Sequence, residues 1–185
     1  MSGVKAFDVV DAVCNRFPKV FSDLKFVVVP DSRLPHAEAE ANSATHTILI
    51  RESTYEAAVN WRPRERFIVA EELCHIALNH SGPRHRNCAG RPVGYSYSER
   101  QDEREARIMA AFLLAPTELA QHCTSKSEVK DQFLMSNQAA EIRWEQLERH
   151  RRHKAGQKRQ LPLGVIDFLR IQRSKGFRIQ TDLDE

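Results

Sequence analysis

Residues 67–80 read Phe67-Ile68-Val69-Ala70-Glu71-Glu72-Leu73-Cys74-His75-Ile76-Ala77-Leu78-Asn79-His80, and this stretch decides the fold. Pro63 precedes the segment and Ser81-Gly82-Pro83 closes it, which predicts one helix over about 64–80. Two acids and a histidine lie inside this largely apolar helix. Glu71 and His75 are four residues apart and therefore project from one face, while Glu72 is one residue further round the helix.

This spacing is that of a His-Glu-x-x-His helix, in which two side chains hold zinc and the inner Glu is the general base of a metalloprotease. Here the first position is Glu71 instead of His. Glu-Glu-x-x-His alone is a weak pattern, because acids and histidines at helical spacing usually form a solvated face. The helix by itself therefore leaves a metal site and an ordinary polar face as alternatives.

Two further segments resemble parts of a known family. One reads Glu103-Arg104-Glu105-Ala106-Arg107-Ile108-Met109-Ala110-Ala111-Phe112-Leu113-Leu114-Ala115-Pro116, within a predicted helix over about 99–114. The other reads Leu134-Met135-Ser136-Asn137-Gln138-Ala139-Ala140-Glu141-Ile142-Arg143 and opens a predicted helix over about 137–153. With the first helix, in this order and spacing, they resemble the ImmA/IrrE family of bacterial metallopeptidases over roughly residues 26–147.

The resemblance implies an α+β fold with a zincin-like metallopeptidase core, a small sheet plus active-site helices, and a helical, helix-turn-helix-like C-terminal extension. It also implies site residues, matched position by position: Glu71, His75 and Glu105 as metal ligands and Glu72 as the catalytic general base. The sequence departs from the family pattern by Glu for His at 71, Cys for Gly at 74 and Arg for Asn at 107.

A site with two carboxylates and one imidazole is compatible with Zn²⁺, since carboxylate oxygen is an accepted ligand. It is also harder and more negative than a two-histidine site, which favours Mn²⁺ as an alternative. A third alternative is a site without metal, in which a guanidinium neutralises the acids. Arg107 is two residues from Glu105, but its side chain should leave nearly the opposite face, so Arg104 or Arg66 is expected to be better placed.

The remaining pattern predicts a helix over 4–17, strands at 25–29 and 45–50, and a last helix over about 162–175 followed by a short strand at 177–181. Residues 31–43 form a polar stretch without clear periodicity. We expect a metallopeptidase-like domain over residues 1–120 and a helical C-terminal extension over residues 121–185.

The net charge of the 185 residues is +3, with 41% hydrophobic and 29% charged residues. The longest apolar runs fall far short of the ~20 residues that a membrane span needs, and Met1–Asp8 carries an acid where an export signal needs an apolar core. Four scattered cysteines do not form a disulfide scaffold. We therefore expect a cytoplasmic protein without a membrane partner.

The positive charge is concentrated in residues 149–160, which hold six Lys or Arg, two histidines and no acid, so the rest of the chain sums to −3. These cations complement the negative C-terminal end of the helix that carries them. They also fit a phosphate backbone or an acidic protein surface. DNA binding would use Arg149, Arg151, Arg152 and Lys154.

The family resemblance implies an endopeptidase that cuts a helix-turn-helix repressor, often encoded beside it, and so relieves repression of mobile-element or stress genes. Because of the variant position 71, the sequence leaves two functions open. One is a metal-dependent endopeptidase that acts on such a repressor or another regulatory protein. The other is a catalytically inactive pseudoprotease that serves as a protein- or DNA-binding transcriptional regulator.

Overall fold

A computed structural model describes residues 6–80, 84–87, 97–156 and 163–178 of the chain. The chain divides into two compact units, residues 1–148 and 149–185. The first unit contains a mixed sheet and most of the helices, which confirms the predicted α+β class with a helical C-terminal part. Val129, Phe133 and Leu147 belong to the core of the first unit. The division into residues 1–120 and 121–185 stays a prediction about domains.

The sheet has four strands in the order β1-β3-β2-β4. β1 (Lys25–Val29) runs parallel to β3 (Thr47–Arg51), and β2 (Ala37–Asn42) lies antiparallel to both β3 and β4 (Arg84–Asn87). The predicted strands at 25–29 and 45–50 correspond to β1 and β3.

β2 lies in the stretch for which the sequence showed no clear period. Its residues Ala-Glu-Ala-Glu-Ala-Asn alternate between buried and partly buried, so the strand has period 2 after all. Ala and Glu are both depleted in strands, and the small alanine gives a weak apolar signal, which explains why the sequence did not predict this strand. β4 and the helix α2 (Glu52–Val59) were not predicted either.

The N-terminal helical segment is shorter than the predicted helix over 4–17 where it is described. It begins at Val9, where the Asp8 side chain accepts a hydrogen bond from the Asp11 backbone N–H, and residues 1–5 lie outside the described part. The remaining helical elements are π-helical η1 (Ala12–Arg16), the 3₁₀ turns η2 (Phe17–Lys19) and η3 (Asp31–Arg33), α1 (Val9–Asp11), α3 (Pro63–Ala77), α4 (Tyr97–Leu114), α5 (Thr117–Ala120), α6 (Lys126–Phe133), α7 (Asn137–Lys154) and α8 (Leu163–Ser174).

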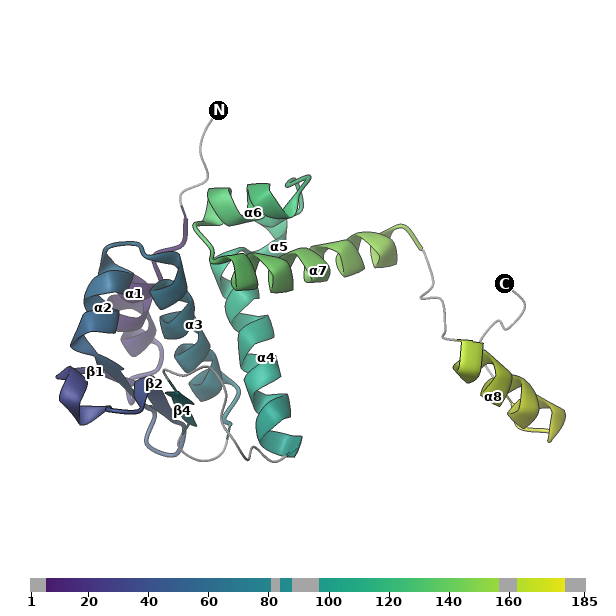
Figure 1. Cartoon of the computed structure of the whole chain (residues 1–185), viewed down its shortest axis with the longest axis horizontal. Helices are drawn as coiled ribbons and strands as arrows, with labels where there is room; N and C mark the ends of the chain where they lie inside the picture. The colour runs from purple at the N-terminus through teal and green to yellow at the C-terminus, as the bar shows by residue number, and fades with distance from the viewer. Residues whose placement is uncertain (1–5, 81–83, 88–96, 157–162, 179–185) are drawn as a thin grey trace. The chain divides into compact units, whose positions relative to one another are not determined.

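Helix α3 lies at the centre of the first unit. It packs against the sheet through β2 and β3, against α1 and α2, and along its length against α4 (Figure 1). Every residue from Arg66 to His75 is buried as a result. A polar side chain on this helix therefore lies in protein, and needs polar or charged partners there.

Two buried arginines attach the later helices to this core. Arg66 donates to the carbonyl oxygens of Phe133, Leu134 and Phe7 and stacks on Trp61. Arg143 of α7 donates from Nε to the Ala115 carbonyl oxygen at 2.6 Å. Burial lowers the pKa of both guanidinium groups, that of Arg143 to about 10. These bonds make α6 and most of α7 part of the first unit.

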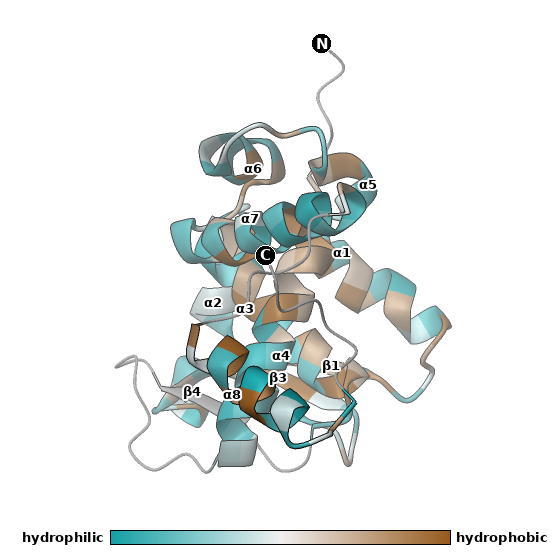
Figure 2. Ribbon diagram, turned by 90° about the vertical axis from the view of Figure 1, so that its right-hand side faces the viewer, coloured by the Kyte–Doolittle hydropathy of each residue, from teal (hydrophilic) through white to brown (hydrophobic). Residues whose placement is uncertain are grey.

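Ser136 caps α7 as predicted, because its Oγ accepts a hydrogen bond from the Ala139 N–H. In the second unit, α8 occupies the predicted segment and exposes Leu163, Val165, Phe168 and Ile171, and its ribbon carries both hydrophilic and hydrophobic colours in Figure 2. The predicted strand at 177–181 falls largely outside the described residues. None of the described helices combines the length and apolar composition that crossing a bilayer requires.

Candidate metal centre

Helices α3 and α4 bring two carboxylates and one imidazole to a single point. Glu71 and His75 come from α3, Glu103 comes from α4, and one donor atom from each lies within 4.8 Å of the other two. His75 Nε2 is 3.5 Å from Glu103 Oε1. Glu71 and His75 are almost completely buried, and the Glu103 side chain is 18% exposed.

The end of α3 adds a second histidine to this group. Asn79 adopts a left-handed conformation with φ of 52°, which asparagine tolerates better than most residues and which turns the chain back on the helix. The His80 backbone N–H then donates to the His75 carbonyl oxygen at 3.1 Å, and the two imidazoles meet with Nδ1 atoms 2.9 Å apart. His80 is 7% exposed. The Ser43 hydroxyl also donates to the His75 carbonyl oxygen, at 3.1 Å.

A guanidinium lies beside the carboxylates of the group. Arg107 Nε donates to Glu71 Oε1 at 3.0 Å, and Arg107 Nη2 is 3.8 Å from Glu103 Oε2. The expectation that Arg104 or Arg66 would be better placed is wrong. Arg107 is one helical turn from Glu103, so both side chains face α3, whereas Arg66 is bonded to backbone carbonyl groups elsewhere in the core.

The structure places Glu103, and not the predicted Glu105, beside Glu71 and His75. The Glu105 side chain is 47% exposed; its Oε1 accepts from Gln101 Nε2 at 2.6 Å and its Oε2 lies 3.8 Å from His80 Nε2. The signal for Glu103 was present in the sequence. Ala106, Ala110, Ala111 and Leu114 form the buried stripe of α4, and Glu103 continues that stripe at the spacing of three residues.

Glu72, the predicted general base, is 3% exposed and lies next to Glu71 on the buried helix α3. Its neighbour Cys74, at the position where the family pattern has Gly, is also buried. Burial is the main cause that raises the pKa of the Cys74 thiol to about 12, with Glu71 adding to the effect. Cys74 is therefore a neutral thiol in the metal-free protein.

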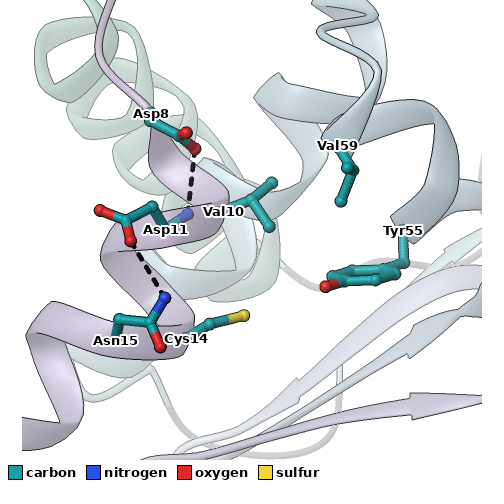
Figure 3. Close-up of a pocket in the computed structure, with 7 residues that line it drawn as sticks. All are labelled: Asp8, Val10, Asp11, Cys14, Asn15, Tyr55 and Val59. Atoms are coloured by element: carbon teal, nitrogen blue, oxygen red, sulfur yellow. Dashed lines mark hydrogen bonds between the residues drawn. The ribbon is translucent and has the colours of Figure 1, made fainter.

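A cavity elsewhere in the first unit offers a second place for a ligand. Its volume is about 230 Å³ and it is lined by Asp8, Val10, Asp11, Cys14, Asn15, Tyr55 and Val59 (Figure 3). The two carboxylates accept hydrogen bonds from neighbouring groups of their own helix, Asp8 from the Asp11 N–H and Asp11 from Asn15. Burial raises the pKa of the Cys14 thiol, so it is not an activated nucleophile.

Acids and a histidine that meet between two packed helices form a group that could hold a metal ion, as metallopeptidases do. The chain matches the family model described as the IrrE N-terminal-like domain over residues 37–145, more than half of its length, and it belongs to that peptidase family. No curated protein and no solved structure matches it.

The donor set fits a divalent metal. Carboxylate oxygen and imidazole nitrogen are both ligands of Zn²⁺ at 2.0–2.2 Å, and the 3.5 Å between His75 Nε2 and Glu103 Oε1 suits two ligands of one ion. Two carboxylates in a largely buried position also need positive charge nearby. Arg107 supplies part of it, and a divalent cation between the three donors would supply more.

Proposed function

We propose that the chain is a metal-dependent endopeptidase that acts on a regulatory protein, and that Glu71, His75 and Glu103 bind its one divalent ion. The observation that carries this proposal is the convergence of these three donors from α3 and α4. Zn²⁺ is the first candidate, and Mn²⁺ is the alternative that two carboxylates favour. When bound, such an ion polarises a carbonyl group and lowers the pKa of bound water.

Within this proposal Glu72 accepts a proton from the attacking water. It is buried on the helix that carries two of the metal-binding residues, and it occupies the position of the general base in the family pattern. The proposed target is a helix-turn-helix repressor of mobile-element or stress genes, or another regulatory protein. Membership of the IrrE N-terminal-like family supports this target class through the resemblance to proteins that cut repressors.

A pair of matched variants tests the metal centre and its third ligand. We expect Glu103→Gln to lose most of the bound metal, because it removes the carboxylate that lies beside His75. Glu105→Gln, two residues further on the same helix, should retain about one ion per chain when metal is saturating. Elemental analysis after exposure to Zn²⁺ or Mn²⁺ and removal of the excess measures both. Loss of metal from Glu105→Gln alone would instead support the ligand set inferred from the motif, and a wild-type protein that binds neither ion would overturn the proposal.

One observation favours a second function, that of a pseudoprotease. The Arg107 guanidinium contacts Glu71 at 3.0 Å and lies 3.8 Å from Glu103, at a position where the family pattern has Asn. It compensates carboxylate charge without a metal. Such a protein would act by binding a regulator or DNA, and the cations at the end of α7 are the surface with the charge for it.

The basic segment distinguishes these two functions. If the chain is a DNA-binding regulator, neutralising the four cations to Gln should weaken duplex binding and flatten its salt dependence. The slope of log K against log salt should fall by roughly 0.9 for each phosphate that the variant no longer neutralises. Fluorescence anisotropy with a duplex at several salt concentrations measures this. The four cations are Arg149, Arg151, Arg152 and Lys154.

The control variant neutralises Arg170, Arg173 and Lys175, which belong to the same C-terminal unit. It should keep the wild-type slope. Equal effects of the two variants would indicate only a general charge effect. No measurable duplex binding by the wild-type chain would leave a protein partner as the proposed target of the basic segment.

A further inference from the structure

We propose that His80 is a positioning residue that fixes the proton of His75 on Nδ1, so that the bare Nε2 of His75 points at Glu71 and Glu103. The inference concerns the site of the proposed function and rests on it for its role in metal binding. The protonation pattern itself is a property of the metal-free protein. It follows from the contact between the two imidazoles and from the charges at both ends of that contact.

The two rings share one hydrogen bond. Nδ1 of His75 and Nδ1 of His80 are 2.9 Å apart, and the rings meet edge to face, with centroids 5.0 Å apart and an angle of 69° between their planes. A neutral imidazole has one N–H and one bare nitrogen. One Nδ1 must therefore donate and the other accept, and the two Nε2 atoms are left in opposite states. Only one of them is bare and able to bind a cation.

The surroundings of His80 Nε2 favour a proton there. This atom is buried and has no hydrogen-bond partner within residues 6–80, 84–87, 97–156 and 163–178. Two carboxylate oxygens lie somewhat further away, Oε2 of Glu105 at 3.8 Å and Oδ1 of Asp102 at 4.0 Å. They attract an N–H and repel a nitrogen lone pair. With its proton on Nε2, His80 accepts at Nδ1, and His75 must donate from its own Nδ1.

In the opposite tautomers, His80 donates from Nδ1 and His75 carries its proton on Nε2. That proton would also be attracted by two carboxylates, those of Glu71 and Glu103. These acids already face a full positive charge from Arg107, at 3.0 and 3.8 Å. Glu105, at the other end, contacts the neutral amide of Gln101. The Glu105 carboxylate beside His80 is therefore the stronger attraction for the N–H, which sets the direction of the shared hydrogen bond.

The consequence for His75 is a lone pair directed into the group that contains Glu71 and Glu103, 3.5 Å from Glu103 Oε1. Histidines that bind metals commonly donate their other N–H to a second group, which fixes the tautomer and the orientation of the ring. His80 is that group here. Asp102 and Glu105 then stabilise the proton on His80 Nε2. Glu105, which the motif predicted as a metal ligand, thus acts on the site through His80.

Nitrogen-15 NMR of the metal-free, full-length chain tests the inference at a pH where both imidazoles are neutral. We expect His75 to show a protonated Nδ1 and a bare Nε2, and His80 to show the reverse. Replacing Asp102 by Asn and Glu105 by Gln together should reduce this preference. The matched control is Glu145→Gln, an exposed carboxylate on α7, which should leave it unchanged. A proton on His75 Nε2 in the wild-type protein would overturn the inference without any variant.

Zinc titration supplies a second readout. His80→Phe removes the acceptor, and we expect it to weaken zinc binding by about tenfold, the lower end of the usual effect of such a partner. His80→Gln offers an amide oxygen to the same N–H and should recover much of the affinity. Equal zinc affinity for wild type and His80→Phe would overturn the role in metal binding. If the wild-type chain binds no zinc, the proposed function fails, and the NMR result still decides the direction of the hydrogen bond.

Discussion

A Glu72→Gln variant is expected to lose cleavage of a helix-turn-helix repressor by roughly 10²- to 10⁴-fold, the usual contribution of a general acid–base group. Glutamine has the shape of glutamate and cannot accept the proton of the attacking water. Metal content and repressor binding should stay at wild-type levels, since Glu72 is not one of the three grouped donors. The measurement is the rate of fragment formation by mass spectrometry, with a candidate helix-turn-helix repressor as the substrate.

The control variant is Glu103→Gln, which removes a proposed metal ligand and should lose both cleavage and bound metal. A Glu72→Gln variant that cleaves like the wild type would contradict the assignment of the base. A wild-type chain that binds the repressor with no cleavage, and a silent Glu72→Gln variant, would favour the pseudoprotease function. In that case the Glu71 carboxylate has a structural role in the ion pair with Arg107.

Much of the fold was predictable because its decisive segments have strong periodic signals. α3 begins at Pro63, β1 is rich in β-branched residues, and α7 begins at a Ser cap. The signals that failed are weak for physical reasons. β2 alternates Ala with Glu, two residues with low strand propensity, and it is stabilised by pairing with β3 and β4 on either side. Such pairing is tertiary and leaves no local mark in the sequence.

The site was predictable at the level of one helix and less so between helices. Glu71 and His75 share a face of α3 by spacing alone, and the structure brings them together. The third donor depends on the rotation of α4 about its axis, which packing of Ala106, Ala110 and Leu114 determines. A motif match identifies a position in the sequence, whereas the buried stripe shows which side chains of the helix face α3. Here the stripe favours Glu103, and the same stripe accounts for Arg107.

The contact between His75 and His80 had no counterpart in the sequence analysis. It depends on the left-handed Asn79, which reverses the chain immediately after α3. A turn of this kind brings residues five positions apart into ring contact, outside the helical i and i+4 pairing that sequence periodicity describes. Asn in the position before His80 was the available signal, because Asn is enriched among residues with positive φ.

Positions 71 and 107 differ from the family pattern together, and their side chains contact each other at 3.0 Å. A double variant, Glu71→His with Arg107→Asn, restores the family residues at both. We expect it to bind Zn²⁺ about 10- to 100-fold more tightly than the wild type, which corresponds to roughly 1.4 to 2.8 kcal/mol of binding free energy. The second imidazole is a better zinc ligand than the carboxylate in this place, and the removal of Arg107 takes a positive charge away from the ion. Isothermal titration of the metal-free proteins measures the difference.

The single variants show whether the two positions act as a unit. Glu71→His alone leaves the Arg107 guanidinium without its Glu71 partner in a partly buried place, so its gain in zinc affinity should be smaller than that of the double variant. Arg107→Asn alone leaves the Glu71 carboxylate with less positive charge and should also bind a divalent ion more tightly than the wild type. Contacting residues are expected to give non-additive effects. Additive effects would mean that the two positions act on the metal independently of each other. A double variant that binds zinc no better than the wild type would mean that Arg107 does not compete with the metal, and that restoring the two family residues does not restore a zinc site.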